Sequence, residues 1–180
     1  MAENIFFEDE QKRELSEYLK FDLASRENLG ETLPLMIYRL FEYSMREELI
    51  EEFGKERQIE VFRKAGYRAG IFFADHMLDI SLNKNEFLAM LQKKMVELCI
   101  GVLRIESIDE EKETTILTVA EDAVCSGLPL LGETVCNYDE GFIAGIFSRY
   151  TGKEYTAVEI DCWASGDRVC RFQVAPREGR

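Results

Sequence analysis

The stretch that decides the fold is residues 154–174, which read EYTAVEIDCWASGDRVCRFQV. Alternation of apolar and polar side chains predicts two strands, Glu154–Cys162 and Arg168–Val174. Between them, the segment Ala164–Asp167 contains Gly166, which can take the positive φ that a tight turn requires. We therefore expect a β-hairpin that brings Cys162 and Cys170 close together.

Four potential metal ligands surround this hairpin: Cys136, Glu159, Cys162 and Cys170, in the pattern C-x22-E-x2-C-x7-C. Thiolates and a carboxylate can form a closed tetrahedral shell, the geometry of a structural zinc site. Glu159 and Cys162 are three residues apart, so a bulge or the end of the strand is needed to turn both inward. The alternative is that these are ordinary buried cysteines, since free cysteine is among the most buried residue types.

Upstream of the hairpin the hydrophobic period changes from helical to extended, which predicts an α+β fold with N-terminal helices packed on an antiparallel sheet. A further helix separates the two hairpins of this sheet. The expected helices are 32–54, 56–78, 84–98 and 138–151, and the first hairpin is formed by strands 101–108 and 114–121. Charged residues from Arg46 to Glu52, at the end of the first helix, indicate a solvated face.

Several motifs resemble the 4-vinyl reductase domain family, which includes sensory domains of regulators that detect aromatic hydrocarbons such as phenol. They are Cys125-Ser-Gly-Leu-Pro129, the run from Cys136 to Gly145, Glu159-x2-Cys162-x-Ala-x-Gly-Asp-x2-Cys170-x-Phe172, and Ala65-Gly-Tyr-Arg-Ala-Gly70. The similarity extends from about Gly30 to Val174. It implies a fold shared with haem nitric-oxide-binding domains and with subunits of a Golgi tethering complex.

The resemblance also implies a zinc site, because zinc-containing members hold the metal with a cysteine, a glutamate and two more cysteines at this spacing. Carried over, the ligands are Cys136, Glu159, Cys162 and Cys170. Cys125 is the residue that could replace Glu159 in a four-cysteine shell.

Small residues recur every four positions in the second helix, at Ala65-Gly66 and Ala69-Gly70. Close approach of another helix or of sheet backbone is the favoured explanation, because glycine inside a helix costs about 1 kcal/mol that packing must offset. Gly141 and Gly145 share one face of the last helix, which suggests close packing of that helix on the sheet.

The alternative explanation of the stripe in the second helix is that it makes room for an apolar ligand. An apolar lining is typical of small-molecule pockets. The candidate lining residues are Phe62, Ala69, Phe72, Phe73, Phe87, Met90, Leu91 and Met95.

The composition limits the partners of the chain. A formal net charge of −13 without a basic stripe argues against direct nucleic-acid binding, which needs clustered Lys and Arg. No stretch approaches the ~20 apolar residues of a membrane span, and the N-terminus lacks the pattern of a signal peptide. We therefore expect a cytoplasmic protein, with its five cysteines present as thiols or metal ligands.

We expect two parts in the chain: an N-terminal segment, 1–29, and a 4-vinyl-reductase-like ligand-binding domain, 30–175. Ile5, Phe6 and Phe7 would be an apolar liability if left exposed, and pairing with a second copy in a homodimer would cover them. The alternative is that this segment folds back on its own domain.

Three functions remain open. The favoured one is a stand-alone, zinc-containing sensor that binds a small hydrocarbon or aromatic molecule and signals through a protein partner. The second is a tetrapyrrole vinyl reductase or its accessory subunit, although no G-x-G-x-x-G dinucleotide motif is present, so an enzyme is the less favoured class. The third is an assembly module, by analogy with the tethering subunits.

Overall fold

The structure is a computed structural model of the chain, and it describes residues 14–20 and 23–177. The chain divides between Leu33 and Pro34 into two compact units. The first unit contains the short helix α1 (Leu15–Tyr18) and a 3-10 turn, Leu23–Arg26. Ile5, Phe6 and Phe7, the candidates for dimerisation, lie outside the described residues.

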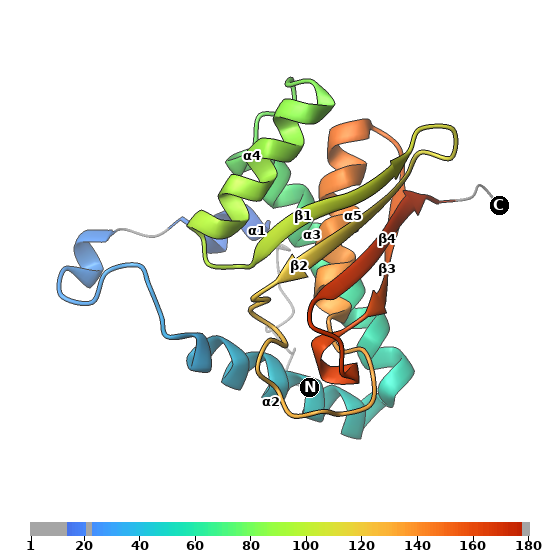
Figure 1. Cartoon of the computed structure of the whole chain (residues 1–180). Coiled ribbons are helices and arrows are strands. Elements are labelled where there is room, and N and C mark those ends of the chain that lie inside the picture. Colours follow the sequence, from blue (N-terminus) through green and yellow to red (C-terminus); the bar gives the residue numbers. More distant parts are fainter. Residues whose placement is uncertain (1–13, 21–22, 178–180) are drawn as a thin grey trace, which may run out of the picture. The chain divides into compact units, whose positions relative to one another are not determined.

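The second unit has the predicted α+β architecture (Figure 1). Each expected element is present, with bounds close to those predicted. The helices are α2 (Leu35–Phe53), α3 (Lys55–Met77), α4 (Lys84–Glu97) and α5 (Asn137–Thr151); the strands are β1 (Val102–Asp109), β2 (Thr114–Ala120), β3 (Tyr155–Asp161) and β4 (Cys170–Pro176). None of the described helices is long and apolar enough to cross a membrane.

The four strands form one antiparallel sheet in the order β1-β2-β4-β3, and helices cover one of its faces (Figure 1). Alternate residues of the central strands are buried against the helices, among them Leu117 and Val119 of β2 and Phe172 and Val174 of β4. The hairpin turn is formed by the 3-10 turn Trp163–Ser165 and by Gly166, whose φ of 113° is the positive value expected for this glycine.

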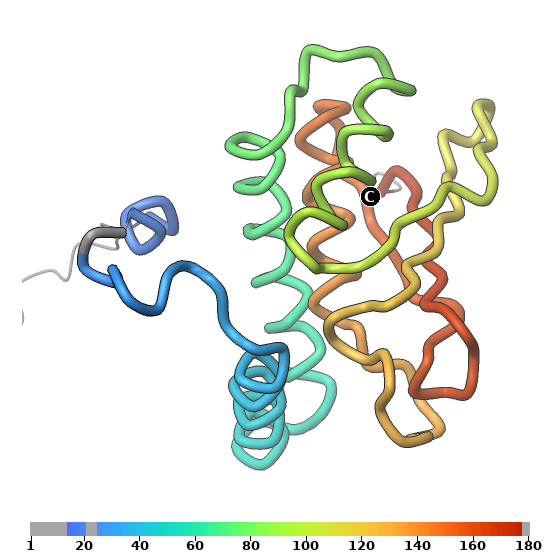
Figure 2. The backbone as a smooth tube through the Cα atoms, turned by 60° about the vertical axis from the view of Figure 1, so that its left-hand side comes forward, coloured from blue at the N-terminus to red at the C-terminus, as the bar shows by residue number. Residues whose placement is uncertain are grey.

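Helices α3 and α5 lie side by side in close contact through glycines (Figure 2). A Cβ atom at Gly66 or Gly70 of α3 would collide with backbone carbonyl oxygens of α5, and one at Gly141 or Gly145 of α5 would collide with those of α3. The favoured explanation of the small-residue stripe is therefore correct: it serves helix packing. The glycines of α5 face α3, however, and not the sheet, so their predicted partner is wrong.

Helix α2 is oriented against its own apolar face. Its only buried residues are Glu42 and Arg46, whereas Leu40 and Phe41 are 65% and 68% exposed. The prediction of a solvated face is therefore wrong for Arg46. This side chain is buried because it donates to Val135 O (2.5 Å) and Asn137 Oδ1 (3.2 Å) and lies over the Phe62 ring.

Candidate metal centre and ligand hollow

Four cysteine sulfurs meet under the start of α5. Their Sγ atoms all lie within 4.8 Å of one another, and all four residues are buried. Cys125 comes from the loop between β2 and α5, Cys136 directly precedes α5, and Cys162 and Cys170 flank the turn of the β3–β4 hairpin. The hairpin therefore brings Cys162 and Cys170 together as predicted, and the loop adds the other two.

The sulfur spacing suits a tetrahedral ion. Four thiolates at about 2.3 Å from a zinc ion are about 3.8 Å apart. Cys136 Sγ lies 3.9 Å from Cys162 Sγ and 3.7 Å from Cys170 Sγ, while Cys125 Sγ and Cys170 Sγ are closer, at 3.0 Å. The donor set of this cluster therefore fits a metal ion that prefers sulfur.

Glu159, the predicted carboxylate ligand, lies next to the cluster. Its Oε2 accepts a hydrogen bond from the backbone N–H of Cys136 (3.0 Å), and its buried Oε1 has no hydrogen-bond partner among the described residues. A register irregularity between Glu159 and Asp161 provides the bulge that the spacing to Cys162 required. Burial, together with the neighbouring Cys162 sulfur, raises the pKa of Glu159 to about 8.

Cys125 is the ligand candidate that takes the place of Glu159 in the group of mutually close donors. The chain positions it through Asp122, whose Oδ1 accepts from the backbone N–H groups of Val124 (2.7 Å) and Cys125 (3.2 Å). Nothing in the spacing of an irregular loop indicates this contact. The sequence signal for it is the cysteine itself, which was a possible replacement for Glu159 on residue type alone.

Helix α2 holds the loop that carries Cys125 and Cys136. Arg39 donates to the carbonyl oxygens of Ala123 (2.8 Å) and Ser126 (2.7 Å), and Tyr43 donates to that of Val124 (3.3 Å). Arg46 binds the carbonyl oxygen of Val135 near the far end of the same loop. Because irregular backbone must find partners for its carbonyl groups, these side chains fix the loop without secondary structure.

A second polar contact ties α3 to the cluster. Arg63 forms a bidentate pair with the buried Glu140, through Nε to Oε2 (2.5 Å) and Nη2 to Oε1 (2.9 Å). Glu140 Oε1 also accepts from the backbone N–H of Glu159 (3.0 Å). Glu140 thereby joins the first turn of α5 to strand β3 at the level of the sulfurs.

The surroundings of the cluster disfavour negative charge. Burial raises the pKa of Asp122 to about 6, and burial, followed by the charge of Asp122, raises the pKa of Asp139 well above its ordinary range. Among the thiols, contact with the Cys125 sulfur lowers the pKa of Cys162 and raises that of Cys136. A cation at the sulfurs would relieve this accumulation of buried acidic groups.

The predicted ligand residues do not form one cavity lining. Phe73, Phe87, Leu91 and Met95 are buried in the main core. The remaining four lie apart from one another: Phe62 under Arg46, Phe72 stacked on the exposed His76, and Ala69 and Met90 partly buried at the edge of the core.

An aromatic hollow of about 260 Å³ lies beside one of them, Phe87, between α4, α5 and the sheet. Its wall is mainly apolar, with Phe147 and Tyr150 from α5, and the Tyr150 ring stacks on Phe87 at a centroid distance of 3.8 Å. The other lining residues are Lys84, Leu88, Glu110, Glu113, Thr115, Thr151 and Tyr155. The size and lining suit a single small aromatic ring.

Comparison with known proteins agrees with the resemblance drawn from the motifs. The family model of the 4-vinyl reductase domain matches residues 115–176, which include the β2–β4 strands and all four clustered cysteines. The uncharacterised protein MJ0150 of Methanocaldococcus jannaschii is 27% identical over 152 residues, which span 81% of this chain and 78% of that protein.

Three solved structures share the fold. The phenol-responsive sensory domain of the transcription activator PoxR, solved with phenol, superposes with a TM-score of 0.62 at 19% identity, covering 90% of this chain and 86% of that one. A vinyl-4-reductase family protein from Methanocaldococcus jannaschii gives a TM-score of 0.53 at 15% identity, covering 87% and 92%. Trafficking protein particle complex subunit 3 from Naegleria fowleri, covalently bound to palmitic acid, gives a TM-score of 0.65 at 12% identity, covering 80% and 95%. At these identities the likeness establishes the fold.

Proposed function

Because the chain carries a 4-vinyl reductase domain, we propose that it is a zinc-containing sensor that binds a small aromatic or hydrocarbon molecule and passes the signal to a protein partner. The observation that carries the proposal is that one helix, α5, connects the cysteine cluster with the aromatic hollow. It begins directly after Cys136, and its last two turns contribute Phe147 and Tyr150 to the hollow.

The metal would be held by Cys125, Cys136, Cys162 and Cys170, with Glu159 fixing the backbone of Cys136. Bound zinc would supply a structural cross-link, since thiolates brought together only in the native fold couple metal binding to folding. The set of Cys136, Glu159, Cys162 and Cys170 is the alternative. In either set the sulfurs join the loop, the start of α5 and the hairpin into one rigid end of the domain.

The aromatic ligand would bind in the hollow beside Phe87. Support comes from its lining and from the shared fold of the phenol-responsive PoxR domain. A ring that enters between Phe147 and Tyr150 displaces side chains of α5 and α4, and α5 is rigidly fixed at its other end.

The output surface would be the exposed apolar face of α2, which includes Met36, Leu40, Phe41 and Phe53, each at least 64% exposed. A contiguous apolar face of this kind exceeds what a monomer commonly leaves uncovered. Its inner face contacts the start of α5 through Arg46 and Asn137, so a movement of α5 reaches α2 directly. A second copy of the chain is the occupant we propose for this face.

The ligand proposal is tested by thermal shift with phenol and toluene. Saturating ligand at a hundredfold excess over Kd stabilises by about 2.7 kcal/mol, which corresponds to a Tm increase of about 5–10 °C. Leu88→Phe, which fills the hollow, should abolish this increase. Leu98→Phe, the same change at an exposed position just after α4, should leave it intact. Equal shifts in both variants would reject the aromatic hollow as the site.

The dimer proposal is tested by sedimentation at micromolar concentration. A dimer that becomes monomeric with Leu40→Glu, but not with Glu48→Gln on the same helix, supports the α2 face as the interface. A wild-type monomer would instead leave α2 for a different protein, which is the arrangement that the assembly alternative requires. A visible absorption band from a copurified tetrapyrrole or flavin would favour the reductase alternative.

A further inference from the structure

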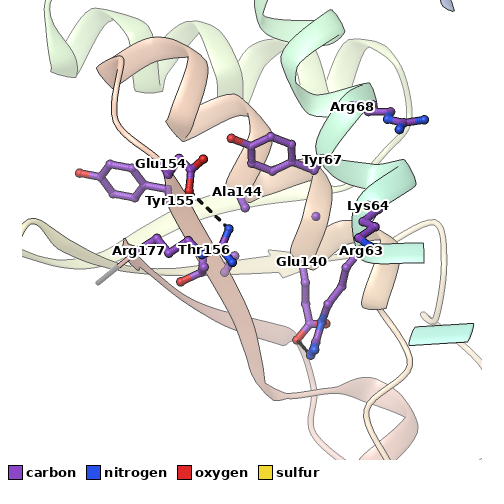
Figure 3. A pocket seen from close by; sticks show the side chains of 12 residues that line it. Arg63, Lys64, Tyr67, Arg68, Glu140, Ala144, Glu154, Tyr155, Thr156 and Arg177 are labelled. Carbon is purple, nitrogen blue, oxygen red and sulfur yellow. Dashed lines mark hydrogen bonds and ion pairs between the residues drawn. The ribbon is translucent and has the colours of Figure 1, made fainter. Parts of the chain in front are cut away.

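A second and larger hollow, of about 510 Å³, opens on another side of α5, between α3, α5 and the sheet edge (Figure 3). Its volume lies in the range of about 300–1,000 Å³ that is typical of small-molecule sites. The lining residues are Arg63, Lys64, Tyr67, Arg68, Glu140, Gly141, Ala144, Glu154, Tyr155, Thr156, Ala157 and Arg177.

The floor of this larger hollow is apolar and flat. Gly141, Ala144 and Ala157 carry no side chain larger than a methyl group, so a ligand can approach the backbone of α5 and β3 closely. In Figure 3, Tyr67 and Ala144 lie between the Glu154–Arg177 pair on one side and Lys64 and Arg68 on the other. The floor suits a planar apolar body, against which the Tyr67 ring can pack.

The rim of the larger hollow is cationic. Four cations and two acids line it, in a chain whose net charge is −13. One of the acids, Glu140, is buried and already bound to Arg63 and to the backbone of Glu159. The other, Glu154, is 3.4 Å from Arg177 in a pair whose side chains are mostly exposed, which makes the pair weak.

Arg68 is the cation with capacity to spare. Lys64 is paired with Glu60 on the same helix, whereas Arg68 forms no hydrogen bond or ion pair with any residue that the structure describes. Arg63 uses Nε and Nη2 for Glu140, which leaves donors at Nη1. Guanidinium groups with free donors at the edge of an apolar floor are suited to a carboxylate.

We propose that this hollow binds an amphipathic monoanion: a planar aromatic body on the Gly141–Ala144–Ala157 floor, with a single carboxylate held by Arg68 and the neighbouring cations. This site is separate from the aromatic hollow of the proposed function. The mouth of that hollow carries Glu110 and Glu113, which would repel an anion. The two sites therefore select ligands of different charge.

The test uses 1-naphthoate and its neutral counterpart, 1-naphthalenemethanol, titrated into the intact chain by calorimetry and by 1H–15N NMR. We expect the carboxylate to bind about tenfold more tightly than the alcohol, and added salt to reduce this difference. Amide shifts should centre on Gly141, Ala144 and Thr156.

Two charge reversals separate a specific site from general attraction. Arg68→Glu should weaken naphthoate binding about fivefold or more, as expected for the loss of an exposed charge pair. Arg104→Glu reverses an exposed cation on β1, outside the hollow, and should leave binding unchanged. Equal effects of the two reversals would overturn the proposal, as would equal affinity for the alcohol. Amide shifts centred on Phe87 and Phe147 would do the same, and would assign the ligand to the aromatic hollow.

Discussion

Helices α5 and α2 bury opposite kinds of side chain. Ten consecutive residues of α5, from Asp139 to Ser148, are buried, and most of them are apolar or glycine. In α2 the buried residues are Glu42 and Arg46, while large apolar side chains cover its exposed side. The two helices lie in the same compact unit and were equally easy to recognise as helices.

The difference follows from what each helix meets. Helix α5 meets the backbone of α3 through paired glycines and the apolar face of the sheet on another side. Helix α2 meets the carbonyl oxygens of the cysteine-bearing loop, which only polar donors such as Arg39, Tyr43 and Arg46 can satisfy. The partner, more than the composition of the helix, decides which face is buried.

The largest expected effect comes from breaking the α3–α5 contact. Gly66→Leu places a side chain where the Tyr138 carbonyl of α5 lies, so the two helices must separate. We expect the free energy of unfolding to fall by at least about 3 kcal/mol, at the upper end for overpacking. Ala65→Leu adds the same side chain at the adjacent, exposed position and should change it by less than about 0.5 kcal/mol in urea denaturation. Similar losses in both variants would show that the contact is not what α5 depends on.

Helix α2 should respond to loss of a polar group. Arg46→Leu leaves the carbonyl oxygen of Val135 and the side chain of Asn137 without their donor, and it leaves Glu42 without its cation. An apolar replacement in a buried position should therefore destabilise the domain by about 2 kcal/mol. Arg68→Leu, at a position with no polar partner among the described residues, serves as the control in the same denaturation experiment. A neutral or stabilising Arg46→Leu would mean that α2 is held by its apolar contacts after all.

The smallest effect is a pH dependence at Glu42. Burial raises the pKa of this carboxyl, so the folded chain keeps its proton in a pH range where the unfolded chain has released it. Stability from this group is complete below the ordinary glutamate pKa and is lost as pH rises through the raised one, by at most about 1.4 kcal/mol per pH unit. Glu42→Gln should therefore gain stability relative to wild type as pH rises above about 5, whereas Glu47→Gln, exposed on the same helix, should not. Parallel pH profiles for Glu42→Gln and wild type would contradict the assignment.

The sequence predicted local structure well and tertiary partners unevenly. Hydrophobic period, Gly54 and Gly166 were enough to place the helices, the strands and the hairpin turn, because these signals act over a few residues. The meeting of Cys162 with Cys170 was predictable for the same reason. Cys125 and Arg46 reach their places through an irregular loop, whose path depends on contacts distant in sequence. For that reason the sequence could name Cys125 as a possible ligand but could not choose between it and Glu159.

The most direct test of the account is the zinc content per chain of two variants purified without chelators. The cluster of Cys125, Cys136, Cys162 and Cys170 predicts that Cys125→Ser loses zinc, whereas Glu159→Gln keeps one ion per chain. Cys99→Ser, which changes an exposed cysteine outside the cluster, should keep its zinc and so controls for general thiol chemistry. Full zinc in Cys125→Ser together with its loss in Glu159→Gln would contradict the account and restore Glu159 as the fourth ligand.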